Sequence, residues 1–390
     1  MFVLLLLLAG LSFGLSIEEA MRTALERSPV LKAMEERLRI FEGMERSALA
    51  FPNPDIGFES GFLTTDKRGK PSGRAVYLLE YSQPIPLWGV REKSRRVVAE
   101  EKESFRKAFE ARRREILAEV YRSFFTALMR KEIVEVWRES VRTAEEVEAF
   151  VKKAYELGEV TELELFRARR ESGMARVQLK IAESLYEASL KELSGLLNAE
   201  VNAVEGKLED VPSLRETDLE EAPTVLALKK RIEAVGRLID LEKALAKPTL
   251  SAGFVIEDSE EGYYGLRLSL STTFPVFYRR QGEILQGIAR REALNRELEA
   301  ELLRLRTKLS SIKVRMETLK KEIERLDGEI IPRAKEELDL AIRSYRLRVI
   351  TLLELSDVRR RYYELLVSRA ELLGNLHGIY AEFIEIGGWR

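Results

Sequence analysis

The sequence repeats itself after about 190 residues, and this feature constrains the possible folds more than any other. Segment 28–33 (SPVLKA) recurs at 222–227 (APTVLA), an offset of 194. Segment 155–165 (YELGEVTELEL) recurs at 345–355 (YRLRVITLLEL), an offset of 190. Further landmarks between them keep the same order, with offsets that differ only by loop lengths. The chain is therefore predicted to be a duplication, so each half should fold into the same series of elements.

Each half contains two short segments in which apolar and polar residues alternate, which predicts half-exposed β-strands. The predicted strands cover about 55–63 and 75–83 in the first half, and about 249–257 and 263–273 in the second. The tips between them, 64–74 and 257–262, are charged and rich in small residues, which is typical of loops in water.

An isolated hairpin is only marginally stable in water, and each half has no other strands. One face of each hairpin is apolar and the other is polar or small. This pattern favours the wall of a transmembrane β-barrel, with lipid outside and water inside. The alternative is a small sheet that packs on a helical body.

A heptad pattern marks the second half. From Leu298 to Ile330 the apolar residues are spaced alternately by four and three positions, which is typical of a left-handed coiled coil. Glu, Lys and Arg fill most positions between them. The 34% of charged residues is therefore assigned mainly to helix surfaces laced with ion pairs.

Helix lengths indicate how the layers are built. Gly89–Leu157 and Tyr278–Leu347 can each form one helix of about 70 residues, roughly 100 Å long. In each half two shorter helices match this length end to end: Pro29–Phe51 with Thr161–Leu197, and Pro223–Lys247 with Thr351–Ile386. Pro332 is expected to kink the second long helix.

The predicted organisation is therefore a first repeat at 15–197, an irregular equatorial linker at 198–222, a second repeat at 223–386, and a tail at 387–390.

Composition excludes several classes of protein. The chain has 390 residues, no Cys and one His, so disulfide frameworks, Cys-based metal sites and two-His metal motifs are excluded. Lys and Arg (65) balance Asp and Glu (66), which argues against a nucleic-acid-binding protein. Nine amide side chains among so many charges suggest a thermophilic source.

The N-terminus resembles a signal peptide, predicted at 1–14. Its apolar run is about 14 residues, too short for the ~20 of a spanning helix, and small residues follow it. The alternative is a buried N-terminal helix. No other stretch approaches the length of an apolar spanning helix.

The combined motifs resemble the TolC-type outer-membrane efflux protein family over residues 15 to about 386. The resemblance rests on 16–29 (SIEEAMRTALERSP), 52–54 (PNP), 82–85 (SQPI), Trp88-Gly89 and the Tyr155 and Tyr345 turns. Within the family, 52–54, 82–85 and the glycine after them are most similar to the cobalt-zinc-cadmium resistance branch.

This resemblance implies a mainly α fold with a transmembrane β-barrel portion: a long antiparallel coiled-coil α-barrel and four strands per protomer, internally duplicated, in a homotrimer. It implies a location in the outer membrane with a long periplasmic portion, after removal of the signal peptide. The implied partners are a periplasmic adaptor (membrane fusion) protein and, through it, an inner-membrane pump.

The family also implies a gate near the second turn. Its acidic pair falls on Glu354 and Asp357, three residues apart and on one helix face. On a three-fold axis they would form two carboxylate rings that select cations. The Gly expected after Tyr345 is replaced by Arg348, and the Arg used for gating links in some relatives falls at Ile350. Arg346 and Arg348 are the nearby substitutes. The alternative is a solvated helix face.

Two further sets of residues are candidate contact sites. The turns are candidates for adaptor docking, because an exposed apolar tip needs a partner; alternatively their leucines close the packing of the tip. The docking candidates are Tyr155, Leu157, Gly158, Thr161, Leu163, Tyr345, Leu347, Thr351 and Leu353. The candidates for aromatic residues at the membrane interface are Tyr77, Tyr81, Trp88, Tyr263 and Tyr264.

No catalytic set or cofactor motif is present, so the chain is expected to be no enzyme and to need no cofactor or metal. His377 is expected to be a packed or surface residue rather than a ligand. The predicted function is the exit duct of a tripartite efflux system for small molecules or metal ions. The alternatives are a type I protein-secretion duct and a soluble coiled-coil scaffold.

Overall fold

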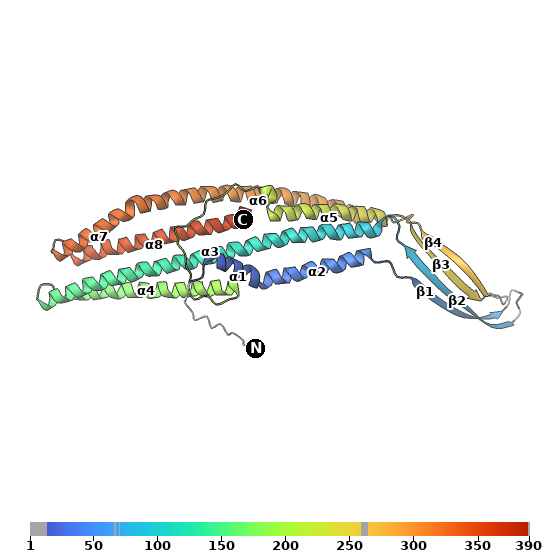
Figure 1. Cartoon of the computed structure of the whole chain (residues 1–390), viewed down its shortest axis with the longest axis horizontal. Helices are drawn as coiled ribbons and strands as arrows, with labels where there is room; N and C mark the ends of the chain where they lie inside the picture. Colours follow the sequence, from blue (N-terminus) through green and yellow to red (C-terminus); the bar gives the residue numbers. More distant parts are fainter. Residues whose placement is uncertain (1–13, 66–67, 70, 259–263, 389–390) are drawn as a thin grey trace, which may run out of the picture. The chain divides into compact units, whose positions relative to one another are not determined.

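The computed structural model describes residues 14–65, 68–69, 71–258 and 264–388, which form long helices and four strands (Figure 1). Residues 1–13 of the predicted signal peptide and residues 389–390 of the predicted tail therefore lie outside the described residues. In chain order the elements are α1 (Ile17–Arg27), α2 (Pro29–Leu49), β1 (Asp55–Thr65), β2 (Pro71–Ile85), α3 (Val90–Glu156), α4 (Glu162–Leu197), the 3₁₀ helix η1 (Leu219–Glu221), α5 (Pro223–Leu245), β3 (Thr249–Asp258), β4 (Tyr264–Thr273), α6 (Gln281–Arg325), the π-helix η2 (Leu326–Ile330), α7 (Ile331–Arg346), α8 (Leu352–Phe383) and the π-helix η3 (Ile384–Gly388).

Local sequence signals set the helix ends. Ser16 caps α1 and Thr351 caps α8, each with a glutamate three residues later that completes a capping box. Thr161 caps α4, whose C-terminus ends at Asn198 in a left-handed conformation. Pro29 and Pro223 begin their helices, where a missing N–H costs nothing.

The second long helix is interrupted slightly before the proline that was expected to kink it. The π-helix η2 occupies Leu326–Ile330, and α7 begins at Ile331 with Pro332 in its first turn. Pro332 has no N–H to donate to the carbonyl of Gly328, and the wider turn accommodates this lost bond. Figure 1 shows the ribbon bending where α6 passes into α7.

The four strands form one antiparallel sheet in the order β1-β2-β3-β4. The two hairpins meet at β2 and β3, where Tyr81 pairs with Phe254. Gly253 is required at this junction, because a Cβ there would overlap the backbone carbonyl oxygen of Tyr81.

The register places most of the large apolar residues of the four strands on one face of the sheet. These residues are solvent-exposed in the single chain: Ile56, Phe58, Phe62, Tyr77, Leu79, Phe254, Ile256, Tyr264, Leu266, Leu268 and Leu270. The opposite face carries mainly glycine, serine and charged residues, together with the half-buried Val76, Leu78 and Val255.

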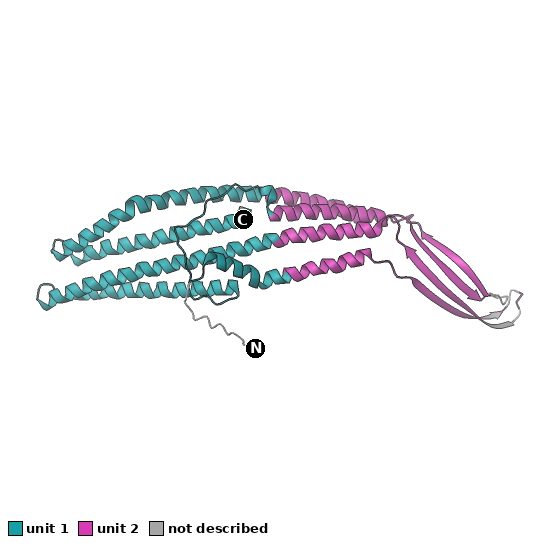
Figure 2. Ribbon diagram, in the orientation of Figure 1, with its two compact units in different colours: residues 1–33, 110–222, 303–390 teal, residues 34–109, 223–302 magenta. Residues whose placement is uncertain are grey.

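The chain forms two compact units, shown in Figure 2, and neither coincides with a sequence repeat. Unit 2 comprises residues 34–109 and 223–302 and contains the sheet. Its helices pack through a core cluster of Val235, Ile239 and Leu294. Unit 1 comprises residues 1–33, 110–222 and 303–390. Each unit thus takes residues from both predicted repeats.

In unit 1 the segment between α4 and α5 contains only the short helix η1 as a named element. Leu15 forms an isolated parallel bridge with Val204, and Lys131 donates to the carbonyl of Val204 at 2.9 Å. Val204 and Leu208 are fully buried. The segment is irregular in backbone but is fixed by buried side chains.

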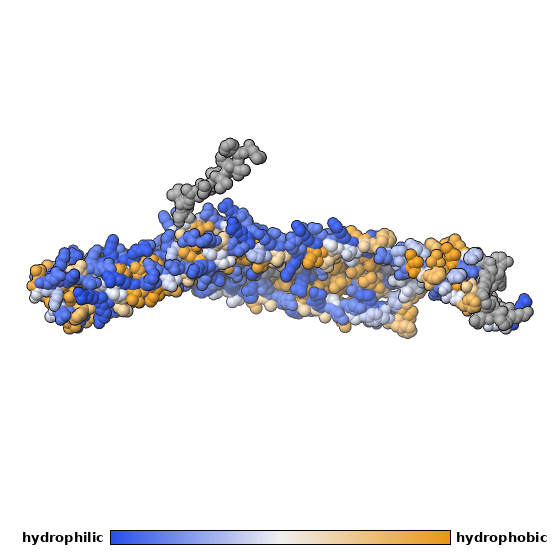
Figure 3. Space-filling model, turned by 90° about the horizontal axis from the view of Figure 1, so that it is seen from below, coloured by the Kyte–Doolittle hydropathy of each residue, from blue (hydrophilic) through white to orange (hydrophobic). Residues whose placement is uncertain are grey.

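Much of the helix surface is hydrophilic, and hydrophobic residues gather on the strands and on part of the helical face of unit 2 and at the interhelical turns of unit 1 (Figure 3). Within the described residues, none of the helices combines the length and the apolar character that crossing a bilayer requires.

Candidate functional site

The turns that join α3 to α4 and α7 to α8 have the same backbone. Gly158 (φ 73°) and Arg348 (φ 62°) are both left-handed, and their N–H groups donate to Tyr155 and Tyr345 at 2.8 and 2.9 Å. The replacement of the expected glycine by Arg348 has therefore not changed the turn. A side chain in this region costs roughly 1–2 kcal/mol, so Arg348 stores local strain.

Arg348 joins the two turns. One guanidinium N–H donates to a Glu159 carboxylate oxygen at 2.6 Å and another to the Glu159 backbone carbonyl at 2.8 Å. Both side chains are about half exposed, so the ion pair itself contributes only a few tenths to about 1 kcal/mol. The geometry nevertheless ties the tip of the first repeat to the tip of the second. Arg346 is exposed and forms no ion pair within the described part of the chain.

The leucines of the tip divide into two groups. Leu165 and Leu355 are buried and, with Val151 and Leu352, form the core of the tip. Leu157 and Leu347 are 73% and 76% exposed, and Leu163, Val349 and Leu353 are exposed as well. The buried group is therefore explained by the packing of the tip. The exposed group forms an apolar surface that this packing does not explain. Tyr155, Gly158 and Thr161 are exposed beside it.

Tyr345 does not belong to this surface, contrary to its prediction as a docking residue. Its side chain is only 7% exposed, because it points into the core of the tip and contacts Phe150 edge-on. Burial raises the pKa of its hydroxyl to about 12. The Tyr345 oxygen is buried without a hydrogen-bond partner, a cost that the aromatic packing offsets.

The two proposed gate carboxylates have partners on their own helix. Glu354 completes the capping box of α8, accepting from the Thr351 N–H at 2.7 Å and from its hydroxyl at 2.9 Å. The Thr351 backbone N–H, then its hydroxyl, lowers the pKa of Glu354. Asp357 pairs with Arg360 at 2.7 Å and with Arg361 at 2.9 Å.

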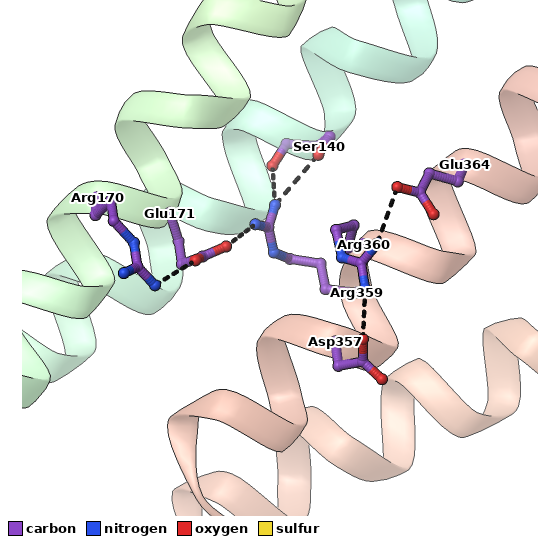
Figure 4. A network of polar contacts seen from close by, with 7 residues as sticks. All are labelled: Ser140, Arg170, Glu171, Asp357, Arg359, Arg360 and Glu364. Atoms are coloured by element: carbon purple, nitrogen blue, oxygen red, sulfur yellow. Dashed lines mark hydrogen bonds and ion pairs between the residues drawn. The ribbon is translucent and has the colours of Figure 1, made fainter.

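A buried arginine lies next to Asp357, a feature that the sequence reasoning missed (Figure 4). Arg359 is 6% exposed and donates to the backbone and the hydroxyl oxygen of Ser140 on α3, both at 3.2 Å. Glu171 on α4 lies 3.7 Å away and pairs with Arg170 as well. Arg359 therefore ties α8 to α3 and α4. Arg359 follows Leu352 and Leu355 at heptad spacing. A charged residue at such a core position is the sequence signal that could have identified it as buried.

The aromatic residues predicted for a membrane interface lie in two places. Tyr77 and Tyr264 are exposed on the apolar face of the sheet, and Tyr81 stacks on Phe254 at 5.2 Å. Trp88 lies where β2 passes into α3, and its indole N–H donates to the carbonyl of Pro248 at 2.7 Å. Tyr263 lies outside the described residues.

Sequence reasoning missed a second exposed group just after β4. Phe274, Val276 and Tyr278 are exposed, and Phe277 is 96% exposed. Their signal was an apolar run that continues past the end of the strand. They lie between β4 and α6, which is the position in the second half that corresponds to Trp88 between β2 and α3 in the first half.

No group of three or more potential metal ligands occurs among the described residues. His377 is fully buried rather than available as a ligand. Its Nε2 donates to the carbonyl of Leu208 at 2.9 Å, and its Nδ1 accepts from the Tyr121 hydroxyl at 2.8 Å. It also stacks on Phe125 with ring centroids 3.5 Å apart. Burial lowers its pKa to about 4.

Comparison with known proteins finds one family model and one curated relative that agree with each other. A family model described as "Outer membrane efflux protein" matches residues 20–199. The cobalt-zinc-cadmium resistance protein CzcC of Cupriavidus metallidurans is 21% identical over 372 residues, which cover 93% of this chain and 87% of CzcC.

Solved structures share the fold over nearly the whole chain. CusC, described in terms of folding and transmembrane channel formation, aligns with a TM-score of 0.80 at 15% identity, covering 96% of this chain and 92% of CusC. The open state of the MtrE outer membrane channel of Neisseria gonorrhoeae aligns with a TM-score of 0.77 at 17% identity, covering 95% of this chain and 88% of MtrE.

Proposed function

We propose that the chain is a member of the outer membrane efflux protein family and forms the outer-membrane exit duct of a tripartite efflux system. The observation that carries this proposal is the sheet: one of its faces is apolar across all four strands and exposed in the single chain. A face of this size needs a covering, and lipid is the covering that matches its chemistry. A soluble scaffold would not expose it.

We infer that three copies close the sheet into a barrel. Strands β1 and β4 are the two edges, and each has one side without a partner strand among the described residues. Open edges are not tolerated in a bilayer, because the backbone N–H and C=O groups there have no water to bind. Pairing of β4 with β1 of the next copy satisfies them, and three four-stranded sheets give a barrel of twelve strands.

We propose that the interhelical tips dock on a periplasmic adaptor, through which the duct reaches an inner-membrane pump. The support is the exposed apolar surface made by Leu157, Leu163, Leu347, Val349 and Leu353. Tyr155, Gly158, Thr161 and Thr351 border it. Tyr345 supports the surface from the core.

We propose that the cargo includes divalent metal cations. The support is the likeness to CzcC, whose name connects it with cobalt, zinc and cadmium resistance, along 93% of this chain. In this proposal Glu354 and Asp357 form the acidic gate, with Arg346 and Arg348 beside it. Since Asp357 is paired with Arg360 and Arg361, Glu354 carries most of the selectivity for cations.

Single-channel recording in planar bilayers tests the duct and its gate. The purified chain should insert from detergent and conduct, and Glu354→Gln with Asp357→Asn should lower the ratio of cation to anion permeability severalfold. A glutamine at position 354 can still accept from Thr351, so the helix cap is kept. The matched control is Glu336→Gln with Asp339→Asn, an exposed acidic pair of the same spacing on α7.

Two results would contradict the proposals. A chain that stays soluble without detergent and never conducts would rule out the duct. An unchanged permeability ratio in the double variant at positions 354 and 357, in a channel that still conducts, would rule out the gate while leaving the duct intact.

A further inference from the structure

Unit 2 contains a strongly basic cleft between the beginning of α3 and the end of α5. Its volume is about 250 Å³, and its lining consists of Lys93, Arg96, Arg237, Asp240, Lys243, Ala244 and Lys247. Five of these seven residues are cationic and one is anionic. No sequence motif marks the cleft, because 140 residues separate its two sides.

The positive charge of the cleft is mostly uncompensated. Arg96 pairs with Glu92 at 2.9 Å, whereas Arg237, Lys243 and Lys247 form no ion pair among the described residues. Five cations and Asp240 give the lining a net charge of +4. Two neighbouring acids offset part of it: Glu92, which is shared between Arg95 and Arg96, and Glu233, which interacts with Arg237. Such a site repels metal cations and attracts anions.

The local structure adds to this preference. Lys93 and Arg96 lie in the first two turns of α3, at the positive end of a helix of 67 residues. The guanidinium groups of Arg96 and Arg237 supply planar donor pairs that match phosphate oxygens, and the lysines supply point charges. The cleft is large enough for one phosphate group with its substituents.

The cleft also lies close to the ends of strands β2 and β3. Lys247 is two residues before β3, and Lys93 is eight residues after the end of β2. Lys243 lies in the last turn of α5, and Lys247 follows the end of that helix by two residues. Trp88, an aromatic residue typical of membrane interfaces, lies at the same boundary, and the Lys247 ammonium sits 4.7 Å from its ring centroid.

We propose that this cleft binds a phosphate group, and that the headgroup of an anionic phospholipid at the membrane surface supplies it. The lipid source rests on the proposed function, because it needs the sheet to lie in a bilayer. The phosphate chemistry does not, because it rests only on the lining residues. Binding there would fix the depth at which the sheet sits in the membrane.

Isothermal titration of the full chain in a non-ionic detergent tests the proposal with three probes. They are dihexanoyl phosphatidylglycerol, the zwitterionic dihexanoyl phosphatidylcholine, and inorganic phosphate. The cleft variant is Arg237→Gln with Lys243→Gln. The matched control is Arg290→Gln with Lys313→Gln, two exposed cations on α6 that form no ion pair among the described residues.

We expect phosphatidylglycerol to bind more tightly than phosphatidylcholine. The cleft variant should weaken the binding of phosphatidylglycerol about 10- to 30-fold, because each removed charge contributes a factor of about ten or less. The control should change it less than twofold. A second variant, Asp240→Asn, removes the one acidic lining residue and should tighten binding even if the double variant folds poorly.

A loss of affinity for phosphatidylglycerol alone identifies the lipid headgroup as the source, and an equal loss for inorganic phosphate identifies a free phosphate. Equal affinities of the wild type, the cleft variant and Asp240→Asn would overturn the proposal. Single-channel recording of the same variants separates the two hypotheses: a conducting channel without phosphate binding refutes only the cleft, and phosphate binding without conductance refutes only the duct.

Discussion

At the scale of residues, Arg348 shows how one side chain can compensate for an unfavourable backbone. Its φ of 62° matches the φ of 73° at Gly158 in the equivalent turn, where glycine adopts that conformation without strain. The strain of roughly 1–2 kcal/mol is offset only in part by the ion pair with Glu159. The presence of an arginine at position 348 is therefore explained by the connection that it makes between the two turns and not by a gain in stability.

This explanation predicts the order of two variants. Arg348→Gly loses the pair but relieves the strain, so its free energy of unfolding should lie within about 1 kcal/mol of the wild type. Arg348→Ala loses the pair and keeps the strain, so it should be about 1 kcal/mol less stable than Arg348→Gly. Urea unfolding in detergent measures both. Equal stabilities would show that the turn relaxes to another conformation.

His377 is the second residue whose surroundings decide its behaviour. Its neutral form donates to Leu208 and accepts from Tyr121, and burial lowers its pKa from the ordinary 6.5 to about 4. The folded chain therefore keeps the imidazole neutral below pH 6.5, where the unfolded chain takes up a proton. The stability that results is complete above pH 6.5 and is lost as the pH falls towards 4.

We expect the free energy of unfolding to fall by about 2 kcal/mol more in the wild type than in His377→Gln between pH 7 and pH 5. The chain has a single histidine, so the difference between the two proteins isolates this group from the carboxylates. The measurement is urea unfolding at the two pH values. Parallel loss of stability in both proteins would contradict the assignment.

At the scale of elements, the π-helix η2 and the irregular segment between α4 and α5 share one anchor. Arg369 on α8 binds Asp327 in η2 at 2.6 Å, Glu209 in the segment at 3.0 Å and Glu132 on α3 at 3.2 Å. Its guanidinium is mostly buried, so these pairs are less screened than surface pairs. The bend before Pro332 is therefore held by a defined contact as well as by the proline.

The tip is the element at which docking is predicted. Leu157→Ser with Leu347→Ser should weaken binding of the adaptor encoded by the same genome at least 10-fold, because two exposed leucines would otherwise be buried in the complex. Both residues are exposed, so the free energy of unfolding should change by less than about 0.5 kcal/mol each. Surface plasmon resonance measures the affinity.

Leu285→Ser with Leu303→Ser is the matched control for docking, since both residues lie on α6 and are 66% exposed. This control should bind the adaptor as the wild type does. If the two double variants lose affinity equally, the tip is not the docking surface.

At the scale of the whole molecule, the sheet requires an environment that a single chain in water does not supply. Leu268, 89% exposed, faces away from the chain on β4, and Ser271 lies on the opposite face of the same strand. Leu268→Arg should cost about 2–4 kcal/mol on insertion into a bilayer, whereas Ser271→Arg faces water and should cost little.

This difference can be measured by refolding the protein into lipid vesicles and running unheated samples on a gel. The readout is the fraction of protein that migrates as an undissociated trimer. We expect Leu268→Arg to lower that fraction strongly and Ser271→Arg to leave it near the wild type. Equal fractions for the two variants would show that the apolar face does not meet lipid.

The sequence by itself determined the features that depend on local periodicity. Period-2 alternation located the four strands, and the heptads together with Pro29, Thr161 and Thr351 located the long helices and their ends, because side-chain direction follows from the backbone repeat. The repeat of about 190 residues predicted that both halves carry the same order of elements, which the structure has. The apolar surface of the tip was predicted only in part, since spacing alone did not show that Leu157 is exposed and Leu165 is buried.

Only the tertiary structure decided which groups from distant parts of the sequence meet. The tie between Arg348 and Glu159 spans 189 residues, and the bond between His377 and Leu208 spans 169. The burial of Tyr345 and Arg359 and the charge of the cleft on α3 and α5 likewise depend on neighbours supplied by other helices. Burial, pKa and ion pairing are properties of a three-dimensional environment, and a local pattern of residues does not contain that environment.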